Sequence, residues 1–445
     1  MQGILRKLTS LSLYFPRRIH FLSFTGVITL VLLGVPFSIS ESGPVVWGDS
    51  YEDYYVRPVE VELLTNKHSA IADFEPIDKA MNRFIQRQGI VGASLGIVKD
   101  GKLMYAKGFG YADQETEEAV QPYHLFRIGS VSKLITAVAI MKLREDGLLR
   151  MDEQVFGEDG VLNTETYQGI KDKKHYKITV EHLLNHTGGW SKRSFGDPLF
   201  IPLRIADAMG TEGTPDLDTI IKFILSKNLP YRPGTRYDYS NFGYCLLGRV
   251  IEAKSGKPYE DYVRTEILAP LGITNMHLAK NLPEERFENE VSYYDLSVNN
   301  VRPDMYGSGE LVSNAYSFNI EALGAAGGWL ATTADLMKFL VAVDGFKDSP
   351  DLLSNESLLS MIETKWGRPY GWRSAQVGGT WWRTGTLAGT SALIKRHQDG
   401  TSWVVLANST NHRSRYFTGR ISYIMQKEFS QLDTWPEHDL FSVSY

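Results

Sequence analysis

A run of apolar residues near position 140 limits what this chain of 445 residues can fold into. From Leu134 to Leu143 the sequence LITAVAIMKL is apolar nearly all round and contains no Gly or Pro, which is typical of a helix buried in the centre of a protein. Asp146-Gly147 follows, and the glycine suits a left-handed C-terminal cap. We therefore predict a buried central helix over this stretch.

Ser130 and Lys133 stand at the start of this helix, three positions apart. Residues at this spacing share a helix face, so the Lys133 amine can reach the Ser130 hydroxyl. The unpaired N–H groups of a first helical turn favour negative charge that develops there. The pair can therefore perform Ser–Lys acyl chemistry. The alternative is an ordinary helix-start serine beside a solvated lysine, because this spacing also recurs by chance.

Two later segments favour the chemical interpretation. Tyr239–Asn241 precedes a second apolar helix that ends near Gly256, and Arg383–Gly385 lies in TWWRTGTLAGT, an aromatic and β-branched run that predicts a strand. S-x-x-K, Y-x-N and a basic residue before Thr-Gly, in this order, resemble the serine β-lactamase and penicillin-binding-protein superfamily. The resemblance is to its class C β-lactamase, D-Ala-D-Ala carboxypeptidase and esterase branch, and animal β-lactamase domain-containing proteins are similar over the same stretch.

The resemblance implies a role for each motif residue. Ser130 would be the nucleophile, and a neutral Lys133 would accept its proton directly or through Tyr239. Tyr239 would then return a proton to the leaving group. The backbone N–H groups of Ser130 and Thr386 would form the oxyanion hole. The residues expected to contact the substrate are Asn241, Arg383, Thr384, Gly385 and Thr386.

Arg383 departs from the family pattern, which usually has Lys at this position, or His in many esterases and eukaryotic members. Arginine keeps the positive charge but cannot relay a proton at neutral pH. It could grip a substrate carboxylate with two hydrogen bonds, which favours a substrate with an anionic end. We expect a serine hydrolase that forms an acyl-enzyme, most simply a peptidase or amidase acting on a small acyl, peptide or ester substrate. The alternatives are a carboxylesterase of the same fold and an inactive scaffold or binding protein.

Both ends of the chain predict strands around a helical middle. ASLGIVKDGKLMYAKGFG predicts a β-hairpin turning at Asp100-Gly101, and three further strands precede a helix around residues 412–430. We expect an α/β fold of the α+β type, with a five-stranded antiparallel sheet flanked by helices and a mostly helical domain, as in β-lactamases and transpeptidases. The catalytic domain would span residues 72–430, with 72–128 and 325–430 in the α/β part, 129–324 in the helical part, and 431–445 as a tail.

The N-terminal region predicts a membrane segment. Basic residues in the segment 1–18 precede an uncharged stretch, Phe21–Ser40, that is long enough to span a bilayer. By the positive-inside rule, residues 19–40 would anchor a catalytic domain that is luminal or extracellular, with the N-terminus in the cytosol. A cleaved signal or a mitochondrial presequence is the alternative, giving a secreted or mitochondrial protein. Residues 41–71 are expected to form a linker or stalk.

Composition narrows the remaining classes. The net charge of −5 and 43% hydrophobic residues are ordinary for a globular protein, and no basic tract suggests nucleic acid. The lone Cys245 is expected to be buried on the helix that follows Asn241. No His/Cys cluster has zinc spacing, so neither a metal nor a cofactor is expected. The oligomeric state stays open.

Two segments mimic catalytic motifs. Gly92–Gly96 matches the G-x-S-x-G nucleophile elbow, but that motif needs a strand, a turn and a helix, whereas Ser94 lies inside the predicted hairpin. His186-Thr187-Gly188 resembles the third motif but follows the helical sequence EHLLN. We expect it to be a structural turn below the groove.

Overall fold

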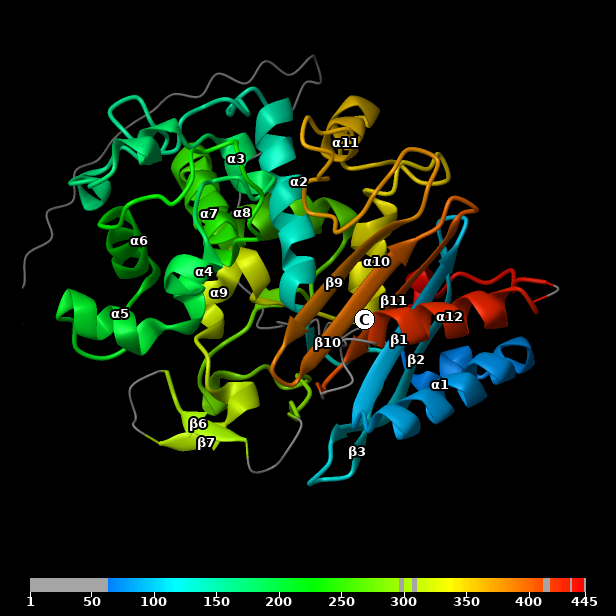
Figure 1. The fold of residues 1–445 in the computed structure, drawn as a ribbon. Coiled ribbons are helices and arrows are strands. Elements are labelled where there is room, and N and C mark those ends of the chain that lie inside the picture. Colours follow the sequence, from blue (N-terminus) through cyan, green and yellow to red (C-terminus); the bar gives the residue numbers. More distant parts are fainter. Residues whose placement is uncertain (1–62, 296–299, 306–309, 411–416, 433, 444–445) are drawn as a thin grey trace, which may run out of the picture. The chain divides into compact units, whose positions relative to one another are not determined.

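The computed structural model describes residues 63–295, 300–305, 310–410, 417–432 and 434–443, which belong to a compact unit that begins at Glu60 (Figure 1). The predicted segments 1–18 and 19–40, and most of the predicted linker, lie outside these residues. The membrane anchor and the localisation therefore stay predictions. Within the described ranges, no helix is both long enough and apolar enough to cross a bilayer.

An antiparallel sheet of six strands joins the two ends of the described chain, in the order β3-β2-β1-β11-β10-β9. The central pairing of β1 with β11 sets Leu95 opposite Val405. The predicted fold class is confirmed, and β3 adds a sixth strand of two residues to the five expected. The strands are β1 (Gly92–Lys99), β2 (Lys102–Asp113), β3 (Glu118–Ala119), β9 (Trp381–Leu387), β10 (Thr390–Arg396) and β11 (Thr401–Ala407).

The hairpin between β1 and β2 turns where the sequence predicted. Asp100 and Gly101 have φ values of 49° and 76°, as a tight two-residue hairpin turn requires. Along β11, side chains alternate between two cores: Trp403 and Val405 pack on one face of the sheet, and Val404 and Leu406 on the other. The sheet is thus buried on both faces.

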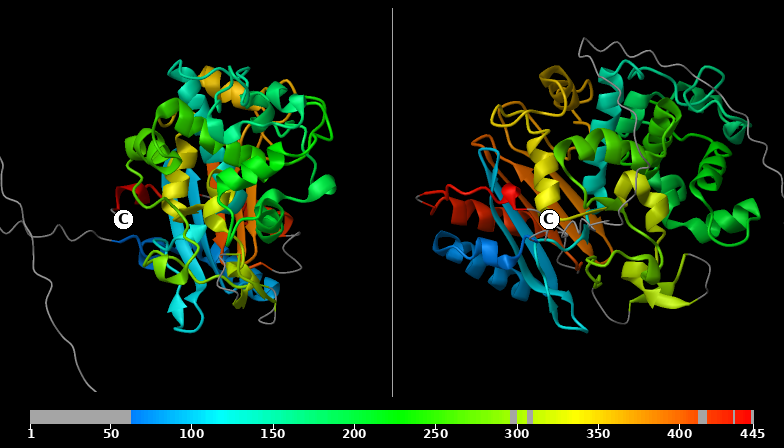
Figure 2. Two further views of the ribbon diagram at one scale, coloured as in Figure 1. Left: turned by 90° about the vertical axis from the view of Figure 1, so that its left-hand side faces the viewer. Right: turned by 180° about the vertical axis from the view of Figure 1, so that it is seen from behind.

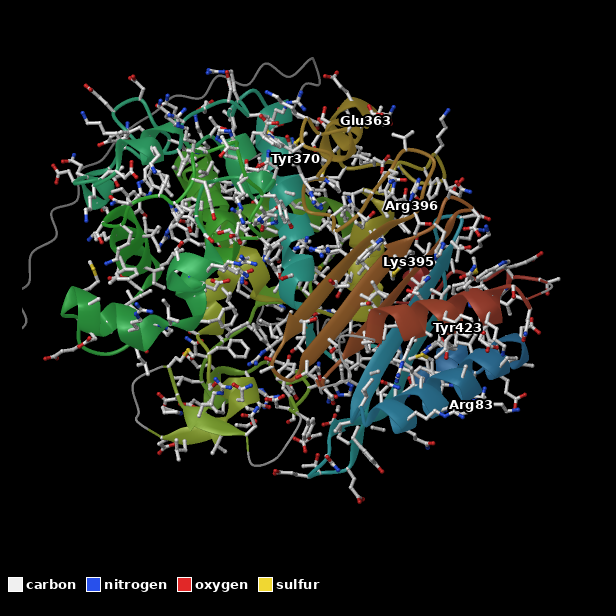
Figure 3. The ribbon with its side chains drawn as sticks, viewed as in Figure 1. Arg83, Glu363, Tyr370, Lys395, Arg396 and Tyr423 are labelled. Carbon is white, nitrogen blue, oxygen red and sulfur yellow. The ribbon has the colours of Figure 1, made fainter. Side chains whose placement is uncertain are left out.

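One face of the sheet is covered by α1 (Glu75–Gln88) and α12 (Phe417–Phe429), which lie side by side (Figures 1 and 2). The apolar face of α1 is buried, and its outer face carries the exposed Arg83 beside the exposed Tyr423 of α12 (Figure 3). The opposite face packs against α10 (Thr333–Val341) and the helical part of the protein.

The predicted central helix is α2 (Ser132–Glu145), and most of its residues are fully buried. It packs against α7 (Asn241–Ser255) and α9 (Ile320–Gly327). α7 ends at the left-handed Gly256, as predicted.

The other helices are α3 (Val180–Leu184), α4 (Lys192–Phe195), α5 (Pro202–Met209), α6 (Leu217–Leu225), α8 (Tyr259–Tyr262) and α11 (Asn355–Ile362). The small strands are β4 (Phe126–Arg127), β5 (His277–Leu278), β6 (Val301–Pro303), β7 (Leu311–Ser313) and β8 (Trp329–Ala331).

Segments outside residues 72–430 also pack on β2. The Ser69 hydroxyl donates to the carbonyl of Ala106 at 2.8 Å and accepts the N–H of the same residue at 2.9 Å. At the C-terminal end, Asp439 Oδ1 accepts the N–H of Leu103 at 3.0 Å. The packed part of the chain therefore extends beyond the predicted catalytic domain at both ends, into the predicted linker and tail.

Candidate active site

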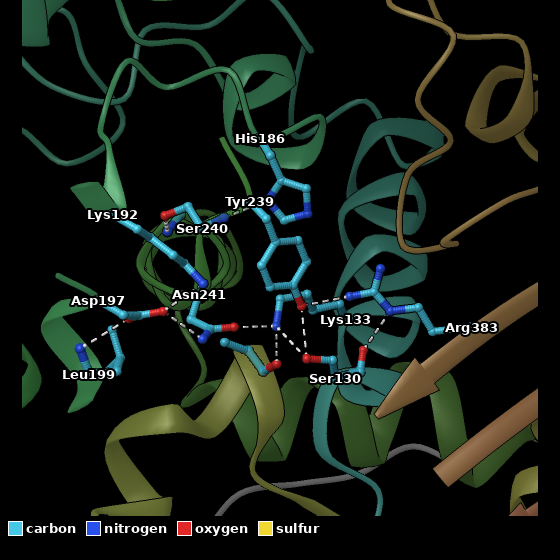
Figure 4. A network of polar contacts seen from close by, with 12 residues as sticks. Ser130, Lys133, His186, Lys192, Asp197, Leu199, Tyr239, Ser240, Asn241 and Arg383 are labelled. Atoms are coloured by element: carbon cyan, nitrogen blue, oxygen red, sulfur yellow. Dashed lines mark hydrogen bonds and ion pairs between the residues drawn. The ribbon is translucent and has the colours of Figure 1, made fainter. Parts of the chain in front are cut away.

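Three elements bring the predicted site residues together (Figure 4). Ser130 lies in a 3₁₀ turn, η3 (Gly129–Val131), which continues directly into α2, and Lys133 is the second residue of α2. Tyr239 precedes α7, whose first residue is Asn241, and Arg383 lies on β9. The Ser–Lys pair thus lies at the start of the buried helix, as the sequence predicted.

Ser130 is within hydrogen-bond distance of two groups that can take its proton. The Tyr239 hydroxyl lies 2.8 Å from Ser130 Oγ, and Lys133 Nζ lies 3.3 Å from the same atom. Lys133 Nζ also donates to Asn241 Oδ1 at 2.8 Å and to the carbonyl of Ala326. The Asn241 and Ala326 oxygens can only accept hydrogen bonds, so they hold the Lys133 amine in place beside Ser130 Oγ.

Arg383 faces the site rather than the solvent. Its Nε donates to the carbonyl of Ser130 at 2.8 Å, and its Nη2 donates to the Tyr239 hydroxyl at 2.9 Å. The residue is only 3% exposed. The guanidinium therefore holds the nucleophile's backbone and the neighbouring phenol in one arrangement.

Burial and charge shift the pKa values of the two proton acceptors. Burial lowers the pKa of Lys133 from its ordinary value. Burial alone would raise the pKa of Tyr239, but the positive charges of Lys133 and Arg383 outweigh it and lower the pKa to about 7. A phenol with this pKa can act as a base at neutral pH.

The predicted oxyanion hole lies where β9 crosses η3. A Cβ atom on Gly385 would come 1.9 Å from the carbonyl oxygen of Ile128 and 3.0 Å from the backbone nitrogen of Ser130. A Cβ atom on Gly129 would come 3.1 Å from the backbone nitrogen of Thr386. Glycine at both positions lets the two backbones approach, and the N–H groups of Ser130 and Thr386 belong to the same crossing. The side chain of Thr386 is exposed there and that of Thr384 is half-buried.

Asp197 and Lys192 extend the site and were not foreseen from the sequence. Asp197 Oδ2 accepts from Asn241 Nδ2 at 2.8 Å and lies 3.2 Å from Lys192 Nζ. Since a carboxylate can only accept, the Asn241 amide nitrogen must face Asp197, and its oxygen then faces Lys133. Asp197 therefore orients the side chain that fixes Lys133. Lys192 begins the four-residue helix α4 and Asp197 follows that helix, in a sequence, GGWSKRSFGD, that carries no periodic signal.

His186 lies against Tyr239, closer to the site than the predicted structural turn implied. Its carbonyl accepts the N–H of Asp238 at 3.0 Å, and its Nδ1 accepts the N–H of Ser240 at 3.2 Å. The rings of His186 and Tyr239 are 4.5 Å apart. Burial, together with the nearby cations, lowers the pKa of His186 well below its ordinary value, which keeps the ring neutral. His186 thus holds the backbone on both sides of Tyr239.

The other candidates from the sequence lie in structural positions. Ser94 is fully buried in β1, and its hydroxyl lies 3.0 Å from that of Thr333. Cys245 is buried on α7, as predicted, and burial raises the pKa of its thiol to about 12. Among the residues described, no group of three or more His, Cys, Asp or Glu side chains could hold a metal ion.

The fold and this set of side chains are those of the β-lactamase type, although the chain spans little more than a third of the first relatives that it matches. The family model Beta-lactamase matches residues 77–420, so the chain belongs to the β-lactamase family. Protein flp of Staphylococcus aureus (strain N315) is 31% identical over 203 residues, which cover 45% of this chain and 37% of flp. Penicillin-binding protein 4* of Bacillus subtilis (strain 168) is 27% identical over 331 residues, covering 71% of this chain and 67% of that protein.

Two solved structures resemble the described fold. The octameric penicillin-binding protein homologue from Pyrococcus abyssi is 26% identical with a TM-score of 0.57, covering 79% of this chain and 77% of that one. D-amino acid amidase from Ochrobactrum anthropi SV3, solved with L-phenylalanine amide, is 23% identical with a TM-score of 0.61, covering 80% and 97%. The amidase, at this identity, supports the fold alone.

Proposed function

We propose that this protein hydrolyses amide or ester bonds of a small acyl or peptide substrate through an acyl-enzyme on Ser130. The observation that carries the proposal is the position of Ser130 Oγ, which is 2.8 Å from the Tyr239 hydroxyl and 3.3 Å from Lys133 Nζ. A serine hydroxyl becomes a useful nucleophile when an adjacent group can accept its proton. Two such groups lie here, and because both have lowered pKa values either could take the proton.

The shorter distance favours Tyr239 as the immediate proton acceptor. As the Ser130 oxygen attacks the acyl carbon, its proton passes to the Tyr239 oxygen, and the negative charge on the substrate oxygen is held by the N–H groups of Ser130 and Thr386. Tyr239 then gives the proton to the leaving nitrogen or oxygen. The positive charges of Lys133 and Arg383 stabilise the phenolate form, in which Tyr239 stands before it takes the Ser130 proton and again after it has given the proton away. Water repeats the sequence on the acyl-enzyme and releases the acid.

One relative supports an amide substrate over an ester. It is named a penicillin-binding protein, and penicillin is a cyclic amide. Arg383 is buried and bonded to Tyr239, which supports a role in holding that side chain. To grip a carboxylate as the sequence predicted, Arg383 would have to use the guanidinium N–H groups that these two bonds leave. A carboxylesterase would use the same acyl-enzyme chemistry.

Labelling with a fluorophosphonate tests the proposal on the purified protein. We expect the probe to modify Ser130, and Ser130→Ala to abolish both labelling and turnover while the melting temperature is retained. Loss of a nucleophile that acts together with its base lowers turnover by about 10⁶-fold. Ser94→Ala is the matched control, because Ser94 lies buried in β1, and it should still be labelled. No labelling of a folded sample, or labelling at another serine, would reject the mechanism.

A further inference from the structure

Lys192 presents a positive charge at the rim of the candidate active site. Its side chain is 43% exposed, whereas that of its partner Asp197 is 11% exposed. Asp197 is held firmly, because Oδ2 accepts from Asn241 and Oδ1 accepts the N–H of Leu199 at 3.3 Å. Asp197 is therefore the fixed member of the ion pair, and Lys192 is the member that reaches the solvent.

The ammonium of Lys192 can bind a ligand without leaving Asp197. A lysine ammonium has three N–H donors, and the contact to Asp197 Oδ2 at 3.2 Å uses one of them. The same Nζ lies 5.0 Å from the centre of the Tyr239 ring, which places it beside the reacting groups. A substrate group that reaches the rim can thus take up the remaining donors.

The two cations on either side of Tyr239 serve different parts of a bound substrate (Figure 4). Arg383 is buried and contacts the Tyr239 hydroxyl, which must face the leaving group to give it a proton. The acyl part then extends the other way, toward Asn241 and Lys192. On this side, Lys192 is the cation that reaches the solvent beside Tyr239, whereas Asp197 is already bonded to Asn241 and Leu199. An anionic group on the acyl part can therefore meet Lys192 at the rim.

We propose that Lys192 is a specificity-determining residue and that the preferred substrates carry a carboxylate on their acyl part. This inference rests on the proposed function and names the substrate class of that site. Lys192, rather than the buried Arg383, would be the cation that recognises the anionic substrate group. The attraction is charge-assisted at a partly exposed site, so we expect it to weaken as the salt concentration rises.

Two matched esters test this assignment. The 4-nitrophenyl monoester of adipic acid carries a free carboxylate on its acyl chain, and its methyl ester carries the same chain without the charge. We expect the wild-type protein to favour the free acid in kcat/KM. Lys192→Gln should reduce this preference by about 10- to 100-fold, the range for a hydrogen bond to a charged group. Lys192→Glu should reverse it. Lys173→Gln, at an exposed lysine of the 3₁₀ helix Lys173–Lys177, should leave it unchanged.

The outcomes separate the inference from the proposed function. Hydrolysis of both esters at equal rates by the wild-type protein, with full dependence on Ser130, would overturn the role of Lys192 and leave the function standing. A preference that survives Lys192→Gln and disappears in Arg383→Gln would also overturn it, in favour of Arg383. Hydrolysis that persists in Ser130→Ala would instead reject the proposed function.

Discussion

Position 383 holds an arginine, whereas the family pattern has a lysine or a histidine, either of which could lose its proton. The guanidinium keeps its charge at any pH at which proteins stay folded, and it touches the Tyr239 hydroxyl directly at 2.9 Å. Together with Lys133 it brings the pKa of Tyr239 down to about 7 although the ring is buried. The substitution therefore exchanges a group that could move protons for one that holds a fixed charge beside the phenol.

Removing this charge should shift the pH dependence of acylation. A base acts only when it is deprotonated, so the rate of fluorophosphonate acylation should fall as the pH drops through the pKa of Tyr239, at about 7 in the wild-type protein. Arg383→Gln removes a stabilising cation and raises that pKa, so the fall should begin about 1–3 pH units higher. Arg383→Lys keeps the charge at neutral pH and should stay near the wild-type profile. An unchanged profile in Arg383→Gln would show that another group titrates.

The sequence predicted the residues that lie on regular elements or in ordered motifs. Ser130, Lys133 and Asn241 could be placed because they stand at the starts of two apolar helices, and Arg383 because it lies in a β-branched run. Asp197 could not be foreseen, because an aspartate whose side chain accepts the N–H two residues on looks like an ordinary turn residue. The role of His186 depends on its left-handed backbone, with φ of 61°, which its sequence did not indicate.

At the scale of elements, the approach of β9 to η3 decides whether the oxyanion hole exists. Neither element alone holds two suitable N–H groups, since Ser130 belongs to η3 and Thr386 to β9. The long strands and α2 could be predicted from alternation and from the apolar run. The small strands β4, β5 and β8 could not, because two or three residues are too short to show a period.

Gly385→Ala should separate these two elements. The new Cβ atom would meet the carbonyl oxygen of Ile128 at 1.9 Å, and this backbone atom cannot turn away as a flexible side chain could. We expect β9 to shift and the Thr386 N–H to leave the site, with a loss of about 10²–10³ in acylation rate. Gly419→Ala in α12 is the control, because open space surrounds that position and alanine favours a helix. Full acylation activity in a folded Gly385→Ala protein would contradict the proposed oxyanion hole.

At the scale of the whole molecule, the sheet depends on both ends of the described chain. β1 and β2 come from the beginning and β9 to β11 from the end. The pairing of β1 with β11 joins these two groups of strands into one sheet. The resemblance to the family set the start of the predicted domain at residue 72. Hydrogen bonds made by residues before that point belong to this chain's own packing, and a resemblance that begins at residue 72 could not indicate them.

A chain that begins at Asp73 should be less stable than one that begins at Leu63. It lacks Leu64, which is 1% exposed and whose burial contributes about 2 kcal/mol, and it leaves the N–H and carbonyl of Ala106 without Ser69. It also loses Asn66, whose side chain bonds Gly108 at 2.7 Å and Val120 at 2.9 Å. After the entropy of ordering the segment is counted, we expect the free energy of unfolding to fall by about 3 kcal/mol.

Urea unfolding of the two chains measures this difference. Leu64→Ala in the longer chain is the matched control for the apolar part, and should account for about 2 kcal/mol or more of the loss. Because the candidate active site uses none of the atoms in these contacts, acylation of Ser130 in the folded fraction should be alike in both chains. Equal unfolding midpoints would show that the segment from Leu63 to Ala72 adds nothing to the stability of the domain, and that its hydrogen bonds to β2 only replace those that water would make.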